Sequence, residues 1–142
     1  MRKIKYLVVH YTASQQDKTV WDICKGWSAK GWAEPGYHVL ISPDGTKTRL
    51  QPDNERSNGA FNFNQDSLHV CTIGGIDAKG KSIDNRTDAQ KKSIIEQLTE
   101  WKKLHPHAEI LGHRDFYRKY KDKENNTACP GFDAIKEYEH IK

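Results

Sequence analysis

The chain alternates between short strand-like runs and amphipathic helical segments, and this alternation constrains its fold more than any other feature. Apolar and β-branched runs, which predict strands, lie at residues 4–10, 37–41, 46–50, 68–73 and 110–113. Helical patterns lie at residues 19–31, at 87–105 and after Asp133. Strands that alternate with helices pack around one shared sheet. We therefore expect an α/β (α+β) fold, a single domain over residues 1–142 with a central mixed β-sheet flanked by helices.

The two longer helices carry start signals and an apolar face. Thr19 with Asp22, and Thr87 with Gln90, have the spacing of capping boxes. We expect the apolar faces of both helices, and the side chains of Trp21, Trp27 and Trp101, to fill the core. The face of the first helix comprises Val20, Ile23, Cys24 and Trp27, and that of the second Ile94, Ile95, Leu98, Trp101 and Leu104.

Composition excludes several classes of protein. The 142 residues carry a net charge of +4 that is scattered, so no basic arm for nucleic acid is evident. No run approaches the ~18 apolar residues of a membrane span. The three cysteines form no complete disulfide framework, and Cys24 and Cys71 are expected to be core residues. We expect a monomer without nucleic-acid or membrane partners, made in the cytoplasm because no signal peptide is evident.

Three residues with metal-binding chemistry stand at the ends of predicted elements. His10 closes the first strand, His113 closes the last one, and Cys129 lies among turn residues. Taken singly, each has an ordinary explanation as a strand-end histidine or an inert buried thiol. Together, two imidazoles and one thiolate make a three-ligand zinc set, which leaves the fourth position of the metal open for water. An open position is typical of a hydrolytic site.

Six short segments in a fixed order resemble a known family. They are Val-Val-His-Tyr-Thr-Ala-Ser (8–14), Gly-Trp-Ala-Glu-Pro-Gly-Tyr-His-Val-Leu-Ile (31–41), Asp-Gly-Thr (44–46), Asp-Ser-Leu-His-Val-Cys-Thr-Ile-Gly-Gly-Ile-Asp (66–77), Gly-His-Arg-Asp (112–115) and Thr-Ala-Cys-Pro-Gly-Phe-Asp (127–133). In this order the chain resembles the zinc N-acetylmuramoyl-L-alanine amidases, a superfamily that includes the amidase-type lysozymes of T-odd coliphages and the peptidoglycan recognition proteins. The resemblance covers nearly the whole chain.

The resemblance implies a site and a reaction. It implies a surface groove with zinc (Zn2+) at its floor, held by His10, His113 and Cys129. Tyr37 falls on the family's active-site tyrosine, and Thr127 falls where relatives carry Lys or Thr. Both are candidate catalytic residues, although Tyr37 also suits a groove wall or the core and Thr127 also suits a turn cap. The implied reaction is hydrolysis of the amide between N-acetylmuramic acid and L-alanine in peptidoglycan.

The chain departs from the coliphage lysozymes in two places. The segment 114–128 is longer and Lys-rich, and we expect a polar loop that either shapes the groove or is a disordered decoration. Gly59 stands where those relatives place a histidine in the groove. His38 and His69 receive no functional role from the sequence, since His38 is expected to point away from Tyr37 on a strand.

The expected function is therefore that of a zinc hydrolase with peptidoglycan as its partner. A phage or prophage endolysin, another antibacterial lytic enzyme such as an injected effector, and a recycling enzyme for cytoplasmic muropeptides share this chemistry and differ in delivery. The first two act on the cell wall after release or delivery. The alternative from another class is a non-catalytic module that binds peptidoglycan without cutting it.

Overall fold

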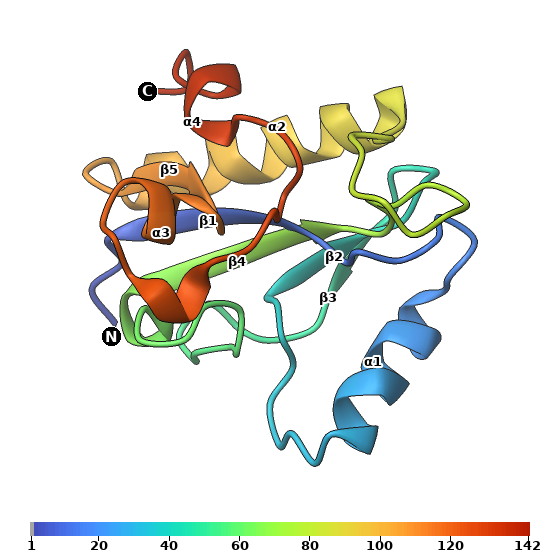
Figure 1. Cartoon of the computed structure of the whole chain (residues 1–142). Coiled ribbons are helices and arrows are strands. Elements are labelled where there is room, and N and C mark those ends of the chain that lie inside the picture. Colours follow the sequence, from blue (N-terminus) through green and yellow to red (C-terminus); the bar gives the residue numbers. More distant parts are fainter. Residues whose placement is uncertain (1) are drawn as a thin grey trace.

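The computed structural model describes residues 2–142, so Met1 of the expected domain lies outside the described residues. Its centre is one five-stranded sheet with the strand order β3-β2-β4-β1-β5 (Figure 1). β3 pairs antiparallel with β2, and the other neighbours are parallel, which confirms the predicted mixed sheet. The strands are β1 (Tyr6–Tyr11), β2 (Val39–Ile41), β3 (Lys47–Arg49), β4 (Ser67–Thr72) and β5 (Glu109–Gly112).

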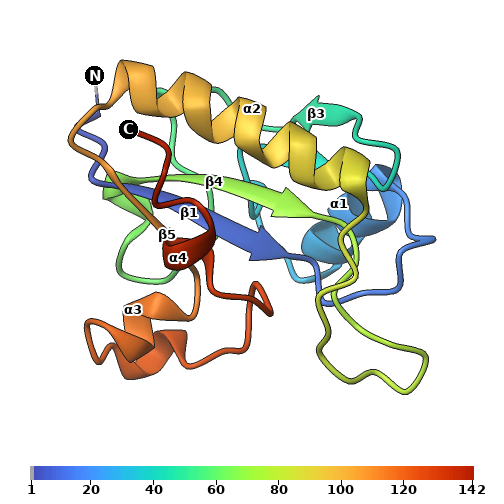
Figure 2. The ribbon, with the colours of Figure 1, turned by 90° about the horizontal axis from the view of Figure 1, so that it is seen from above.

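Helices flank both faces of this sheet. Seen from above, α2 runs across one face with α4 beside it (Figure 2), while α1 lies on the opposite side (Figure 1). Within residues 2–142, no helix has the length and apolar character needed to span a membrane. The helices are α1 (Val20–Ala29), α2 (Asp88–Leu104), α3 (Asp115–Arg118) and α4 (Ala134–Glu137), with 3-10 turns η1 (Asn64–Asp66) and η2 (Lys123–Asn125).

The starts of α1 and α2 lie where the sequence predicts them. The Thr19 hydroxyl accepts a hydrogen bond from the Asp22 N–H, and the Asp22 carboxylate accepts one from the Thr19 N–H. Thr87 and Gln90 make the same reciprocal pair. Each box satisfies two N–H groups that a helix start leaves without a partner, which explains why these short-range signals were sufficient.

The central strands β1, β2 and β4 are buried on both faces, so the sheet has two cores. On the α2 face, apolar side chains of β1 and β4 pack against Ile94, Leu98 and Trp101. On the other face, Val8, Leu111 and Phe116 form one cluster, and a second cluster contains Cys71, confirmed as a core residue. Alternation along β1 therefore places Leu7 and Val9 on the α2 face and directs Val8 and His10 to the face that carries the site.

Several predicted core residues are exposed instead. Trp21 is 66 % exposed and Leu104 is 64 % exposed, and Ile95 is also exposed, so these predictions were wrong. Cys24 is only partly buried. The physical reason in α1 is that the helix sits at the margin of the sheet and has no fully buried residue. Trp101 is fully buried as predicted.

Two further segments differ from expectation. The strand predicted from Tyr37 begins at Val39, so strand alternation does not fix where Tyr37 and His38 point. The segment 114–128, expected to be a polar loop, contains α3 and η2. It is anchored by Phe116, whose buried ring stacks on Phe63 with a centroid distance of 4.0 Å. The anchored segment is therefore not a disordered decoration.

Candidate metal centre and groove

Sheet topology brings His10 and His113 together. β1 and β5 are parallel neighbours, and Val9 pairs with Gly112, so the next residue of each chain segment is His10 or His113. The centroids of the two imidazole rings are 4.8 Å apart. Parallel strands end at the same edge of a sheet, which explains why two strand-end histidines converge although 102 positions of sequence lie between them.

Cys129 reaches the same point from the segment that precedes α4. The Arg114 N–H donates to the Cys129 carbonyl at 2.7 Å, and the Tyr11 N–H donates to the Cys129 Sγ at 3.3 Å. Gly112 allows this approach, since a Cβ at this position would lie 2.6 Å from the Cδ of Pro130. The structure thus brings together the three residues that the sequence predicts as metal ligands.

The distances between these residues suit zinc. The potential ligand atoms of His10, His113 and Cys129 all lie within 4.8 Å of one another. The His10 Nδ1 is 3.6 Å from the Cys129 Sγ. A tetrahedral zinc ion with Zn–N of about 2.05 Å and Zn–S of about 2.3 Å requires an N to S separation of roughly 3.6 Å. The residues present therefore fit the metal that the resemblance implies.

Each imidazole of the cluster has a polar partner on its far nitrogen. His10 Nε2 lies 2.8 Å from His69 Nδ1, and His113 Nε2 lies 2.9 Å from Asn125 Oδ1. This leaves the Nδ1 atoms of His10 and His113 available to a metal. Sequence reasoning missed His69 and Asn125. Alternation offered one signal, because His69 and Cys71 share the sheet face of Val8 and His10.

Burial sets the protonation of the cluster. It lowers the pKa of His10 well below its usual value, and the neighbouring His113, His69 and His38 lower it further. Burial likewise lowers the pKa of His113, against the opposing effect of the Asn125 hydrogen bond. The imidazoles are consequently neutral at pH 7, the form that binds a metal. Burial raises the pKa of the Cys129 thiol to about 12, although the Tyr11 N–H opposes this effect.

Tyr37 lies beside the cluster, just before β2. Its ring centroid is 4.9 Å from that of His10, and the Trp27 ring packs edge-on against it at 5.4 Å. Burial, together with the thiols of Cys71 and Cys129, raises the pKa of Tyr37 well above its usual value. The phenol therefore stays protonated at neutral pH and keeps a hydrogen that it can donate.

Thr127 lies in the turn before Cys129 and faces the groove. Its Oγ1 accepts a hydrogen bond from the Cys129 N–H at 3.2 Å, so the side chain does cap the turn. It also lines the groove next to His113. From this position the hydroxyl group is within the same cavity as the candidate metal ligand His113.

An open groove of about 450 Å³ adjoins the cluster. Exposed aromatic rings of Trp32 and Phe61 form part of its wall, and the Trp32 ring stacks parallel to that of Trp27. The segment 114–128 supplies three lining residues, so it shapes the groove. The lining residues are Trp32, Asn58, Gly59, Phe61, Asn64, His113, Glu124, Asn125 and Thr127.

A mixed α/β sheet with two histidines and a cysteine converging at the edge of a groove is an architecture suited to a metal-dependent hydrolase. Comparison with known proteins identifies the family to which the chain belongs. Residues 1–132 match the family model of N-acetylmuramoyl-L-alanine amidase, and the chain belongs to this family. It is 32 % identical over 135 residues to an endolysin of Klebsiella phage KP32, covering 94 % of this chain and 84 % of that protein.

Solved structures share the fold. The N-acetylmuramoyl-L-alanine amidase LysC from Clostridium intestinale superposes with a TM-score of 0.79 at 23 % identity, covering 99 % of this chain and 88 % of LysC. A bumblebee PGRP-SA superposes with a TM-score of 0.73 at 18 % identity, covering 99 % of this chain and 83 % of that one. At these identities the likeness concerns the fold alone.

Proposed function

We propose that this chain is a zinc-dependent amidase that hydrolyses the bond between N-acetylmuramic acid and L-alanine in peptidoglycan, with residues 1–142 forming one amidase domain. One observation carries the proposal. His10, His113 and Cys129 place three potential ligand atoms within 4.8 Å of one another beside an open groove. Family membership supplies the substrate class, since the family is defined by this amidase activity.

The residues divide into binding and catalytic roles. His10, His113 and Cys129 would hold the zinc ion, which would lower the pKa of bound water to roughly 7 and polarise a carbonyl group. Tyr37, protonated at neutral pH, donates a hydrogen bond to the oxyanion that develops on the scissile carbonyl. Thr127, which lines the groove, is the second candidate catalytic residue, and its hydroxyl would hydrogen-bond the attacking water or the oxyanion. We assign no general base.

The groove is suited to a glycopeptide. Aromatic rings of Trp32 and Phe61 offer apolar surface to sugar or peptide, and the side chains of Asn58 and Glu124 offer hydrogen bonds. We propose peptidoglycan as the partner of a monomeric protein, without nucleic-acid or membrane partners. The KP32 relative is an endolysin. By analogy we propose a phage or prophage endolysin that acts on the bacterial wall after release.

A digest of purified peptidoglycan tests the function. We expect mass spectrometry to detect stem peptides beginning with L-alanine, lost after zinc removal and recovered on zinc addition. Cys129→Ser should abolish release. Cys24→Ser is the matched control, because Cys24 is a free thiol outside the site and its substitution should leave release unchanged.

The same assay identifies the non-catalytic alternative. Binding to peptidoglycan sacculi without any released peptide, in protein that holds zinc, would overturn the amidase proposal and favour a recognition module. In that case Cys129→Ser would leave sedimentation with the sacculi intact. The presence of Cys129 in the cluster supports the enzyme over the module, because binding alone needs no metal-ligating thiol.

A further inference from the structure

The His10 imidazole is the first member of a chain of hydrogen-bonded polar side chains. Its Nε2 lies 2.8 Å from Nδ1 of His69, and His69 Nε2 lies 3.0 Å from Oδ1 of Asn64. The same Asn64 oxygen accepts a hydrogen bond from the Ala60 N–H at 2.8 Å. His10 and His69 are both almost completely buried. The candidate metal cluster is therefore connected through His69 to Asn64, a half-buried residue that also lines the groove.

Hydrogen-bond directions in this chain follow from one backbone group. The Ala60 N–H can only donate, so the Asn64 atom that faces it is the oxygen and can only accept. His69 Nε2 must then carry the hydrogen that it donates to Asn64. A neutral imidazole has one N–H, so His69 Nδ1 is an acceptor. His10 Nε2 must donate to it, which leaves His10 Nδ1 bare and 3.6 Å from the Cys129 Sγ.

We propose that His69 and Asn64 are positioning residues that fix the tautomer and orientation of His10 so that its Nδ1 binds the metal. This inference rests on the proposed zinc site. Outer partners of this kind fix the ring orientation of a metal-binding histidine and raise its affinity as a ligand. His113 obtains the same tautomer from a single residue, because Asn125 donates to the Phe61 carbonyl at 2.8 Å and so turns its oxygen toward His113.

The surroundings of His69 hold its ring in place. Gly59 packs directly on it, and a Cβ at position 59 would lie 2.4 Å from His69 Nδ1. On another side, the His38 ring stacks nearly parallel to it at 5.9 Å, and the backbone N–H of His69 donates to His38 Nδ1. The absence of a side chain at Gly59 is thus required for the contact between His69 and His10. The glycine at position 59, where the coliphage lysozymes place a histidine, is therefore linked to the presence of His69.

Three variants test the proposal through zinc affinity and nitrogen chemical shifts. His69→Leu removes the acceptor at similar volume. His69→Asn is the conservative rescue, because its Oδ1 takes the place of the imidazole Nδ1. Gly59→Ala displaces His69 without altering it. The two readouts are the ¹⁵N shifts of the His10 ring in metal-free protein and the zinc dissociation constant from competition with a chelating dye.

In wild-type protein we expect the His10 hydrogen on Nε2. His69→Leu should give a mixture of tautomers and about 10- to 100-fold weaker zinc binding. Gly59→Ala should shift both readouts in the same direction, and His69→Asn should restore most of the affinity and the wild-type tautomer. If His69→Leu does not fold, Gly59→Ala and His69→Asn still carry the comparison.

The outcomes separate this inference from the proposed function. A wild-type His10 that carries its hydrogen on Nδ1 overturns the inference whatever the zinc affinity. Tight zinc binding that is equal in wild type, His69→Leu and Gly59→Ala overturns the positioning role and leaves the zinc site standing. Wild-type protein that fails to bind zinc refutes the proposed function, and the inference with it.

Discussion

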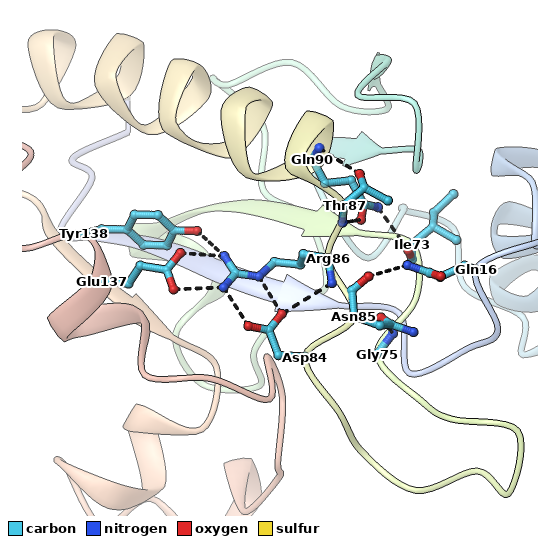
Figure 3. A network of polar contacts seen from close by, with 10 residues as sticks. All are labelled: Gln16, Ile73, Gly75, Asp84, Asn85, Arg86, Thr87, Gln90, Glu137 and Tyr138. Carbon is cyan, nitrogen blue, oxygen red and sulfur yellow. Dashed lines mark hydrogen bonds and ion pairs between the residues drawn. The ribbon is translucent and has the colours of Figure 1, made fainter.

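Arg86 holds the segment that follows Cys129 through hydrogen bonds, and its removal should lower the free energy of unfolding. The guanidinium donates paired hydrogen bonds to Asp84 (2.8 and 2.9 Å) and to Glu137 (2.7 and 2.8 Å), and one to the Tyr138 hydroxyl (2.7 Å), as Figure 3 shows. It also lies 3.4 Å from the centroid of the Phe132 ring. The loop before α2 is thereby tied to α4.

The expected cost follows from the burial of the partners. Breaking a buried ion pair by removing one partner costs about 3–5 kcal/mol, whereas an exposed pair contributes about 0–1 kcal/mol. The Arg86 side chain is 5 % exposed, but those of Asp84 and Glu137 are 32 % and 39 % exposed and regain water when the arginine is lost. Arg86→Met, which keeps the aliphatic stem, should therefore cost about 2–3 kcal/mol, or roughly 6–9 °C in Tm.

Urea unfolding of the metal-free protein measures this cost. The matched control is Arg49→Met, which removes one ion pair with Asp53 from a side chain that is 46 % exposed and should cost less than about 1 kcal/mol. Arg86 lowers the pKa of Asp84 and of Glu137. The two ion pairs of Arg86 therefore contribute their full stabilisation above the ordinary carboxyl pKa values near ~4. This stabilisation declines as pH falls through the lowered pKa values of the two carboxyl groups. Equal costs for the two variants at pH 7 would refute the reasoning.

Three further predictions concern zinc, Tyr37 and His38. Exhaustive chelation should lower Tm, with recovery on zinc addition, because metal binding is coupled to folding; an unchanged melting curve would contradict the zinc site. Tyr37→Phe should reduce peptide release on the order of 100- to 1,000-fold while the zinc dissociation constant stays the same, and loss of zinc would instead make Tyr37 a structural residue. Burial lowers the pKa of His38 to about 4, so the unfolded chain binds a proton that the native chain does not as pH falls from about 6.5 toward 4. Metal-free protein should lose stability over this window, and His38→Asn should reduce the slope of unfolding free energy against pH by about one proton; an unaltered slope would contradict this.

The sequence predicted features that depend on local chemistry. The capping boxes at Thr19 and Thr87 involve residues three positions apart, so no tertiary information is needed to find them. The convergence of His10 and His113 was predictable because parallel strands share an edge. Trp21 and Trp101 show where prediction from local sequence fails. Both are tryptophans in amphipathic helices, but Trp101 is buried and Trp21 is not, because the burial of each depends on how its helix packs on the sheet.

The roles of His69 and Asn125, the hydrogen-bond partners of the candidate ligands, could not be predicted from the sequence for a different reason. Whether His69 meets His10 depends on the register of β4 against β1 and on a missing side chain at Gly59, and neither property is local. Asn125 meets His113 only because Phe116 anchors the segment 114–128 on the sheet.

That segment joins the candidate metal centre to the groove. Asn125 accepts a hydrogen bond from His113 and donates one to the Phe61 carbonyl, so one amide links a candidate ligand to another groove-lining residue. Its neighbours Glu124 and Thr127 line the same cavity. The side chain that accepts a hydrogen bond from His113 and two side chains that line the groove therefore belong to a single anchored segment. A substitution that moves this segment should therefore alter both the hydrogen bond to His113 and the lining of the groove.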